Sequence, residues 1–187
     1  MKTKAFYCVF ISFICVFQIA KAQNEEYKEP ALPINNETKL ITYSKVIETT
    51  ANKDSLFRKG QQWFHTFYKN STGVIREENA ANGKILGKHQ IKVLNPTDKK
   101  GIKTMRGIVQ YSVNTEFKDN KSRIVISEIN LKAASYTPIE KWLDKTSQGF
   151  TPKNYYYLEQ IDKQMYEVIA DFEKFMKEPV KVKKDVW

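Results

Sequence analysis

Hydrophobic residues recur along this chain at two spacings, one typical of helices and one typical of strands. Between Asp54 and Lys69, and again from Tyr155 onward, apolar positions lie three and four residues apart. This spacing predicts two helices, each with one apolar face, and Pro179 is expected to end the second. Gly60 lies within the first apolar face, where it weakens the helix but allows a close approach to a neighbouring sheet.

The other hydrophobic segments alternate with polar residues, as in strands that bury one face. Five segments have this pattern, one before the first helix and four after it: residues 40–47, 74–78, 84–94, 109–117 and 122–131. In the last segment the apolar positions change parity after Ile126. A β-bulge near Ser127 and Glu128 is expected to keep both sets on the core side.

The predicted order is therefore β-α-β-β-β-β-α. Antiparallel strands that bury one face, together with two amphipathic helices, indicate an α+β fold: a single two-layer domain whose antiparallel sheet is covered by two helices. We assign this domain to residues 40–178, after an irregular lead-in over residues 23–39 and before a basic C-terminal tail, residues 179–187. Residues 133–153 are expected to be irregular, with a short helical turn at Pro138 to Leu143.

The first 22 residues have the order of a secretory signal. A positive start is followed by an apolar run from Ala5 to Ile19 and by the small residues Ala20 and Ala22. This predicts a signal peptide, residues 1–22, with cleavage between Ala22 and Gln23. An uncleaved anchor is the alternative, but the run is shorter than the roughly 20 residues that span a bilayer.

Removal of the signal changes the chemistry available to the chain. Cys8 and Cys15 both lie in it, so the mature chain has no disulfide, no thiolate metal site and no cysteine nucleophile. The signal also holds three lysines and no acid, so the net charge falls from +10 to +7. A basic run between Lys99 and Arg106 is either solvated surface or a functional patch.

No catalytic or metal-binding motif stands out, so no catalytic residue, cofactor or metal is expected. His89 lies in phase with Ile85 and Val93 on a predicted strand. It is either a core histidine or a titrating group that faces a pocket. His65 is expected at the surface, and the two histidines lack the spacing of metal ligands.

Three consecutive tyrosines, Tyr155, Tyr156 and Tyr157, open the last helix. Consecutive residues spread around a helix, so at least one is expected to face outward. The three either form a contact surface for a partner or glycan, or anchor the start of the helix on the sheet. Gly60 and Gly87 either leave room for a small ligand or allow close packing.

Several fragments resemble a known family in their order and spacing. They are Leu32-Pro33, Thr38–Glu48, Lys53–Phe57, Gln62–Phe64, Asn82–Lys88 and Ser122–Ile124. Together they resemble secreted domains of unknown function from Bacteroidetes-type bacteria, with a TATA-binding-protein-like fold. The resemblance implies the topology given above and export to the periplasm or outer surface of a Gram-negative-type bacterium, but no reaction and no site residues.

The leading hypothesis from the sequence is a secreted, non-catalytic binding or accessory module of the cell envelope. Its partner would be an envelope protein, a glycan or a small apolar ligand. Nucleic acid is not expected. The TATA-binding protein binds DNA with two copies of this fold unit, whereas this chain has one copy. The alternatives are an envelope hydrolase that uses His89, and a module that lies on a membrane surface through its basic tail.

Overall fold

The structure is a computed structural model that describes residues 27–179. The predicted signal peptide with its cleavage point at Ala22 and Gln23, and residues 180–187 of the predicted tail, lie outside the described residues. The elements, in chain order, are β1 (Tyr43–Glu48), α1 (Lys53–Phe67), α2 (Ser71–Val74), β2 (Ile75–Asn79), β3 (Lys84–Leu94), β4 (Met105–Lys118), β5 (Lys121–Lys132), β6 (Tyr136–Pro138), the 3-10 turn η1 (Ile139–Trp142) and α3 (Lys153–Lys177).

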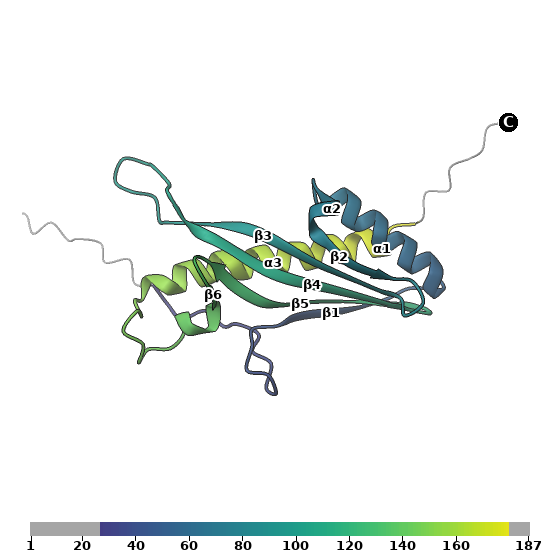
Figure 1. Ribbon diagram of the computed structural model, residues 1–187, viewed down its shortest axis with the longest axis horizontal. Coiled ribbons are helices and arrows are strands. Elements are labelled where there is room, and N and C mark those ends of the chain that lie inside the picture. The colour runs from purple at the N-terminus through teal and green to yellow at the C-terminus, as the bar shows by residue number, and fades with distance from the viewer. Residues whose placement is uncertain (1–26, 180–187) are drawn as a thin grey trace, which may run out of the picture.

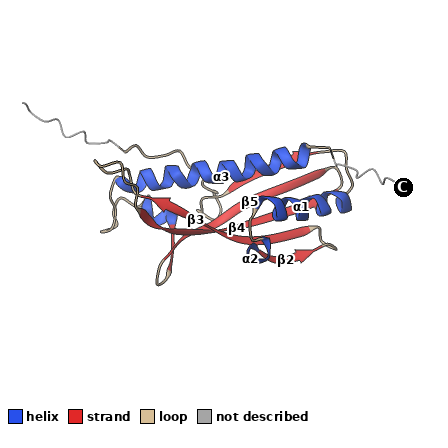
Figure 2. Ribbon diagram, turned by 90° about the horizontal axis from the view of Figure 1, so that it is seen from above, coloured by secondary structure: helices blue, strands red, loops and turns tan. Residues whose placement is uncertain are grey.

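The strands form one six-stranded sheet in the order β1-β5-β4-β3-β2, and β6 pairs with the end of β5. Every pairing between these strands is antiparallel. The two long helices α1 and α3 lie over one face of this sheet (Figures 1 and 2). The predicted α+β fold, an antiparallel sheet covered by two helices, is confirmed. The short elements α2 and β6 were not predicted, and η1 lies where a helical turn was expected.

A side-chain hydrogen bond caps the start of α1, and a glycine inside the helix allows it to pack closely on the sheet. The side chain of Asn52 accepts a hydrogen bond from the Ser55 amide at 2.9 Å, so the first turn has its cap. Inside the helix, Gly60 faces β4, and a Cβ atom there would lie 2.1 Å from Cζ of Phe117. The close approach expected at Gly60 is confirmed, because the aromatic ring occupies the space of the missing side chain.

The expected β-bulge is also confirmed. On β4, Gln110 pairs with Asn130 and Ser112 pairs with Ser127, so β5 contains one extra residue there. Glu128 has a φ of 52°, the left-handed conformation that accommodates the extra residue. The bulge returns Ile129 to the buried face, as the change of parity required.

Two aspartates on the polar edge of α3 bind aromatic side chains of the core. The Trp63 indole N–H donates to Asp171 Oδ1 at 2.8 Å, and the Tyr43 hydroxyl donates to Asp162 Oδ1 at 2.8 Å. The sequence pattern did not predict the role of Asp162 as an acceptor. Both rings are buried while their polar ends reach the helix edge, so their donors are satisfied without a buried charge.

Candidate functional site

A pocket forms where α1 ends above the edge of the sheet. The chain leaves α1 after Phe67, turns through α2 and enters β2, which pairs with β3 only from Lys84 to Gly87. From Lys88 onward, this edge of β3 has no neighbouring strand among residues 27–179. The C-terminal end of α1 and the start of β2 therefore lie together, and they leave an open pocket of about 650 Å³.

The pocket is lined by cations, amides and aromatic rings. Its lining residues are Phe67, Tyr68, Lys69, Asn70, Gly73, Val74, Arg76, Lys88, His89 and Gln90. This lining contains no aspartate or glutamate. Within residues 27–179, neither Lys69 nor Arg76 has a carboxylate within 4.0 Å, whereas Lys88 lies 3.6 Å from Glu128. The two unpaired cations therefore favour a negatively charged occupant.

His89 lies at the inner side of this pocket. Its ring centroid is 4.7 Å from that of Tyr68 and 5.8 Å from that of Tyr111. The hydroxyls of these two tyrosines are 3.3 Å apart and share a hydrogen bond. His89 thus lies on the helix-covered face of its strand, in phase with Ile85, as a core histidine would. It also lines a pocket, which is the second position that the sequence left open.

Burial keeps the floor of the pocket neutral. Desolvation lowers the pKa of the half-buried His89 below 6.5, so the imidazole is uncharged at pH 7. Burial raises the pKa of Tyr111 to about 12, and that of Tyr68 also rises, so both hydroxyls stay protonated. The site therefore has a neutral, aromatic floor and a cationic rim, an arrangement that can hold an anion without itself carrying a buried charge.

We predict that acid weakens this part of the fold through His89. Because its pKa is lower in the folded chain, the unfolded chain takes up a proton first as the pH falls below about 6.5, and the free energy of unfolding decreases. A ¹H–¹³C NMR titration of the His89 ring should give a pKa below 6.5. Denaturant unfolding at pH 5.5 and 7.5 should show a smaller acid loss in His89→Gln, and an equal loss would contradict the prediction.

The structure does not bring the three tyrosines to this pocket, because they open α3 and the pocket lies beside α1 and α2. Tyr155 and Tyr157 are buried, and their hydroxyls donate to Glu29 Oε2 at 3.3 Å and Asn95 Oδ1 at 2.8 Å. The half-buried Tyr156 packs on Tyr27 with ring centroids 5.8 Å apart. These contacts are those of an anchor for the start of the helix, the second of the two sequence interpretations.

The remaining candidate chemistry is sparse. His65 is exposed, and its Nδ1 lies 2.7 Å from Oγ of Ser71. Within residues 27–179, no group of three or more histidine, cysteine, aspartate or glutamate side chains is placed to hold a metal ion. The helices of this same range are also too short or too polar to cross a membrane.

Sequence reasoning missed the cations that line the pocket. Lys69, Arg76 and Lys88 come from a loop and two strands, and no spacing along the chain links them. The sequence offered only an indirect indication of the pocket. A predicted strand over residues 74–78 is much shorter than its predicted neighbour over residues 84–94. A short strand beside a long one leaves part of the longer edge open.

A six-stranded antiparallel sheet with two helices on one face defines this chain as an α+β domain with a TBP-like fold. Residues 43–132 match the domain of unknown function DUF4468, described as having a TBP-like fold, so this part of the chain is similar to that family. The resemblance found in the sequence is thereby confirmed. No curated protein matches the chain at a significant level.

Two crystal structures have the same fold. A DUF4468 family protein from Bacteroides ovatus superposes with a TM-score of 0.59 at 14% sequence identity, covering 87% of this chain and 99% of that chain. A TBP-like protein from Parabacteroides distasonis superposes with a TM-score of 0.52 at 18% identity, covering 75% of this chain and 97% of that chain. At these identities the likeness concerns the fold alone.

Proposed function

We propose that this protein is a secreted, non-catalytic binding module of the cell envelope, and that the pocket beside His89 holds an anionic glycan. Three observations support the proposal. The first 22 residues have the order of a cleaved signal, and the matching family has no assigned reaction. The pocket itself offers unpaired cations rather than an acid–base pair.

The proposal rests on the chemistry of the residues that line the pocket. Lys69 and Arg76 are exposed cations that attract a carboxylate, phosphate or sulfate group. The amides of Asn70 and Gln90 can both donate and accept hydrogen bonds, as sugar hydroxyls require. The ring of Phe67 adds an apolar surface for the face of a sugar ring. This combination suits an acidic sugar better than a purely apolar ligand, which would leave the cations unused.

The same lining supports binding over hydrolysis. A hydrolase that uses His89 as a general base needs a second group to orient the imidazole and a nucleophile or water held beside it. The lining contains no carboxylate for that role, and the nearby hydroxyls of Tyr68 and Tyr111 bond to each other. Among the partners considered from the sequence, a glycan therefore fits the pocket best.

Calorimetric titration of the mature chain, residues 23–187, with an oligosaccharide of uronic acids tests the proposal. The double variant Lys69→Gln with Arg76→Gln should weaken binding at least about tenfold, since hydrogen bonds to charged groups contribute about 1.5–3 kcal/mol each. The double variant Lys118→Gln with Lys121→Gln has the same net charge and alters no residue of this pocket, so it should bind within about twofold of the parent.

Three results would overturn this proposal. Equal weakening by the two double variants would mean that overall charge, and not the pocket, attracts the glycan. Cleavage of the oligosaccharide that disappears in His89→Ala would favour the hydrolase alternative instead. Absence of binding to any acidic oligosaccharide, with the fold intact by circular dichroism, would exclude the glycan as the ligand.

A further inference from the structure

The loop between β3 and β4 extends beyond the rest of the sheet (Figure 1). We call residues 95–104 the β3–β4 tip. Its backbone is held by hydrogen bonds from the Asn95 amide to the Thr104 carbonyl at 2.9 Å and from the Asp98 amide to the Ile102 carbonyl at 3.0 Å. The Asp98 carboxylate accepts from the amides of Lys100 and Ile102, both at 2.8 Å. The tip is therefore a preformed structure whose acidic group bonds to its own backbone.

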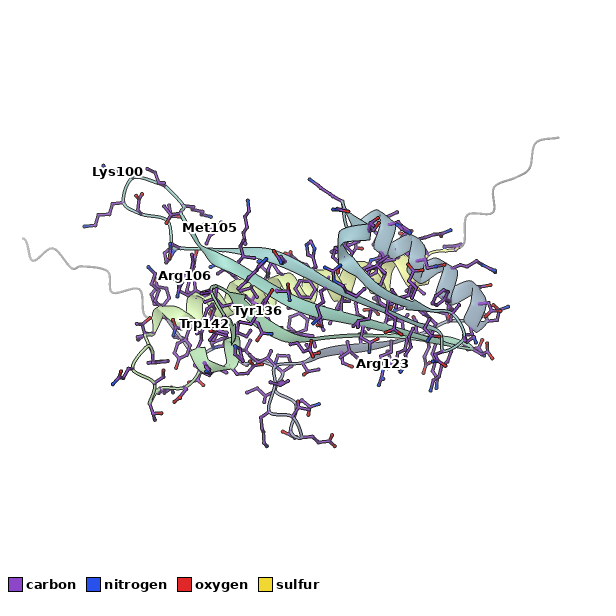
Figure 3. All side chains as sticks on the ribbon, viewed as in Figure 1. Lys100, Met105, Arg106, Arg123, Tyr136 and Trp142 are labelled. Atoms are coloured by element: carbon purple, nitrogen blue, oxygen red, sulfur yellow. The ribbon has the colours of Figure 1, made fainter. Side chains whose placement is uncertain are left out.

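Apolar side chains are exposed on and beside this tip. The side chain of Ile102 is 53% exposed and that of Met105 is 55% exposed, although both residue types are usually buried. Figure 3 shows Met105 where the protruding loop joins the sheet, with Lys100 further out. The core does not cover these two side chains, so both are free to contact a partner outside the described domain.

Cations surround the exposed apolar side chains. Lys99, Lys100 and Lys103 belong to the tip, and within residues 27–179 none of them has a carboxylate within 4.0 Å. Arg106 lies at the base, where its guanidinium carbon is 6.0 Å from the ring centroid of Trp142 and 5.5 Å from that of Tyr157. The tip thus combines unpaired positive charge with apolar side chains at one protruding end of the molecule.

We propose that the β3–β4 tip docks on an anionic phospholipid bilayer. Ile102 and Met105 enter the interface between headgroups and acyl chains, while the lysines lie beside the lipid phosphates. Segments that lie on membranes combine these two features, because the apolar burial and the charge attraction add. A soluble polyanion would pair with the lysines but would leave both apolar side chains in water, so the bilayer is the partner that uses both.

This inference goes beyond the proposed function and is independent of it. It also differs from membrane contact through the predicted tail, residues 179–187, because the tip lies at the opposite end of the domain from the end of α3 (Figure 1). The His89 pocket and the β3–β4 tip share no residue, so each can be removed without altering the other.

Sedimentation with vesicles tests the inference. The mature chain should bind vesicles of phosphatidylcholine with roughly one third phosphatidylglycerol, should not bind pure phosphatidylcholine, and should dissociate as salt is added. Lys99→Gln with Lys100→Gln should lower the vesicle partition coefficient at least about tenfold, because each lysine near an anionic surface contributes about a fivefold attraction. The control Lys118→Gln with Lys121→Gln should bind about as well as the parent.

Insertion of the apolar side chains needs its own readout. Ile102→Ser with Met105→Ser keeps the charge and should still weaken vesicle binding several-fold. Since both cysteines lie in the signal segment, Ile102→Cys gives the mature chain one thiol, and an environment-sensitive dye there should shift to the blue on the anionic vesicles. A chain that ends at Pro179 should bind as the parent does.

The inference is overturned if the mature chain does not bind the anionic vesicles, or if the matched lysine control weakens binding as strongly as the tip variant. It is also overturned if the serine variant binds as well as the parent or the dye emission does not change. The last three of these results would identify attraction by charge alone, without insertion of the tip. Loss of binding in the chain that ends at Pro179 would instead assign the contact to the tail.

Discussion

Replacement of Trp63 by alanine is expected to lower the free energy of unfolding by about 3 to 5 kcal/mol, the usual cost of removing a fully buried tryptophan. Trp63 is 0% exposed. Its ring centroid lies 4.9 Å from that of Phe172 on α3 and 5.1 Å from that of Phe67 on α1. The residue therefore joins the two helices, and its removal would leave a cavity at their contact.

Urea unfolding monitored by circular dichroism measures this loss. A total stability of about 5 to 15 kcal/mol is usual for a domain, so Trp63→Ala should be partly unfolded at moderate temperature. Trp63→Phe keeps most of the apolar volume and should lose clearly less. Asp171→Asn keeps an oxygen acceptor for the indole N–H at that position and should cost about 1 kcal/mol or less. A loss below about 1 kcal/mol for Trp63→Ala would contradict the central role of this ring.

The second large effect is expected at Gly60, where alanine should destabilise the protein by a net of about 2 kcal/mol. In an exposed helix the same change would stabilise by about 1 kcal/mol, because alanine has the higher helix propensity. Here the new Cβ atom would lie 2.1 Å from Cζ of Phe117, a ring that is 1% exposed and packs edge-on against Phe57. Overpacking of a filled core costs about 1–3 kcal/mol, and so short a contact belongs at the upper end.

A double variant separates the clash from other effects of the substitution. Phe117→Leu alone should destabilise, because it leaves a cavity. If the ring of Phe117 is what excludes a side chain at Gly60, then Gly60→Ala should cost much less in the Phe117→Leu background than in the parent. Equal costs in the two backgrounds would show that the two sites are independent.

The larger elements of this fold could be predicted because each follows a regular period. The stripe through Leu56, Trp63 and Phe64 has the helical spacing, and all three side chains are buried. The change of parity after Ile126 located the bulge at Glu128, since only an extra residue returns Ile129 to the core. By contrast, α2 and β6 contain four and three residues, too few for any period to be visible.

The pocket could not be predicted, because its residues are brought together by the points at which elements end. Lys69 follows α1, Arg76 lies on β2 and Lys88 lies on β3. Their approach depends on β2 beginning opposite Gly87, which is a property of strand pairing rather than of local sequence. His89 was identified because its phase along one strand is a local property, although its phase did not reveal the pocket.

Buried polar groups were a second source of missed contacts. Lys59 is 9% exposed, and its ammonium group donates to the carbonyl of Met176 at 2.9 Å and also to that of Glu178. These are free carbonyls at the C-terminal end of α3, where a cation is favoured. A lysine beside an apolar stripe is ordinarily assigned to solvent, but its long side chain crosses from one helix to the end of another.

The position of β1 in the sheet has a consequence for how the chain folds. β1 is an edge strand, and its partner is β5, with Tyr43 opposite Ile126 and Glu48 opposite Lys121. A chain that emerges with its N-terminus first therefore presents this strand long before its partner exists. Because such distant pairing is slow and leaves apolar residues exposed meanwhile, we expect late closure of the domain and a need for protection of the nascent chain.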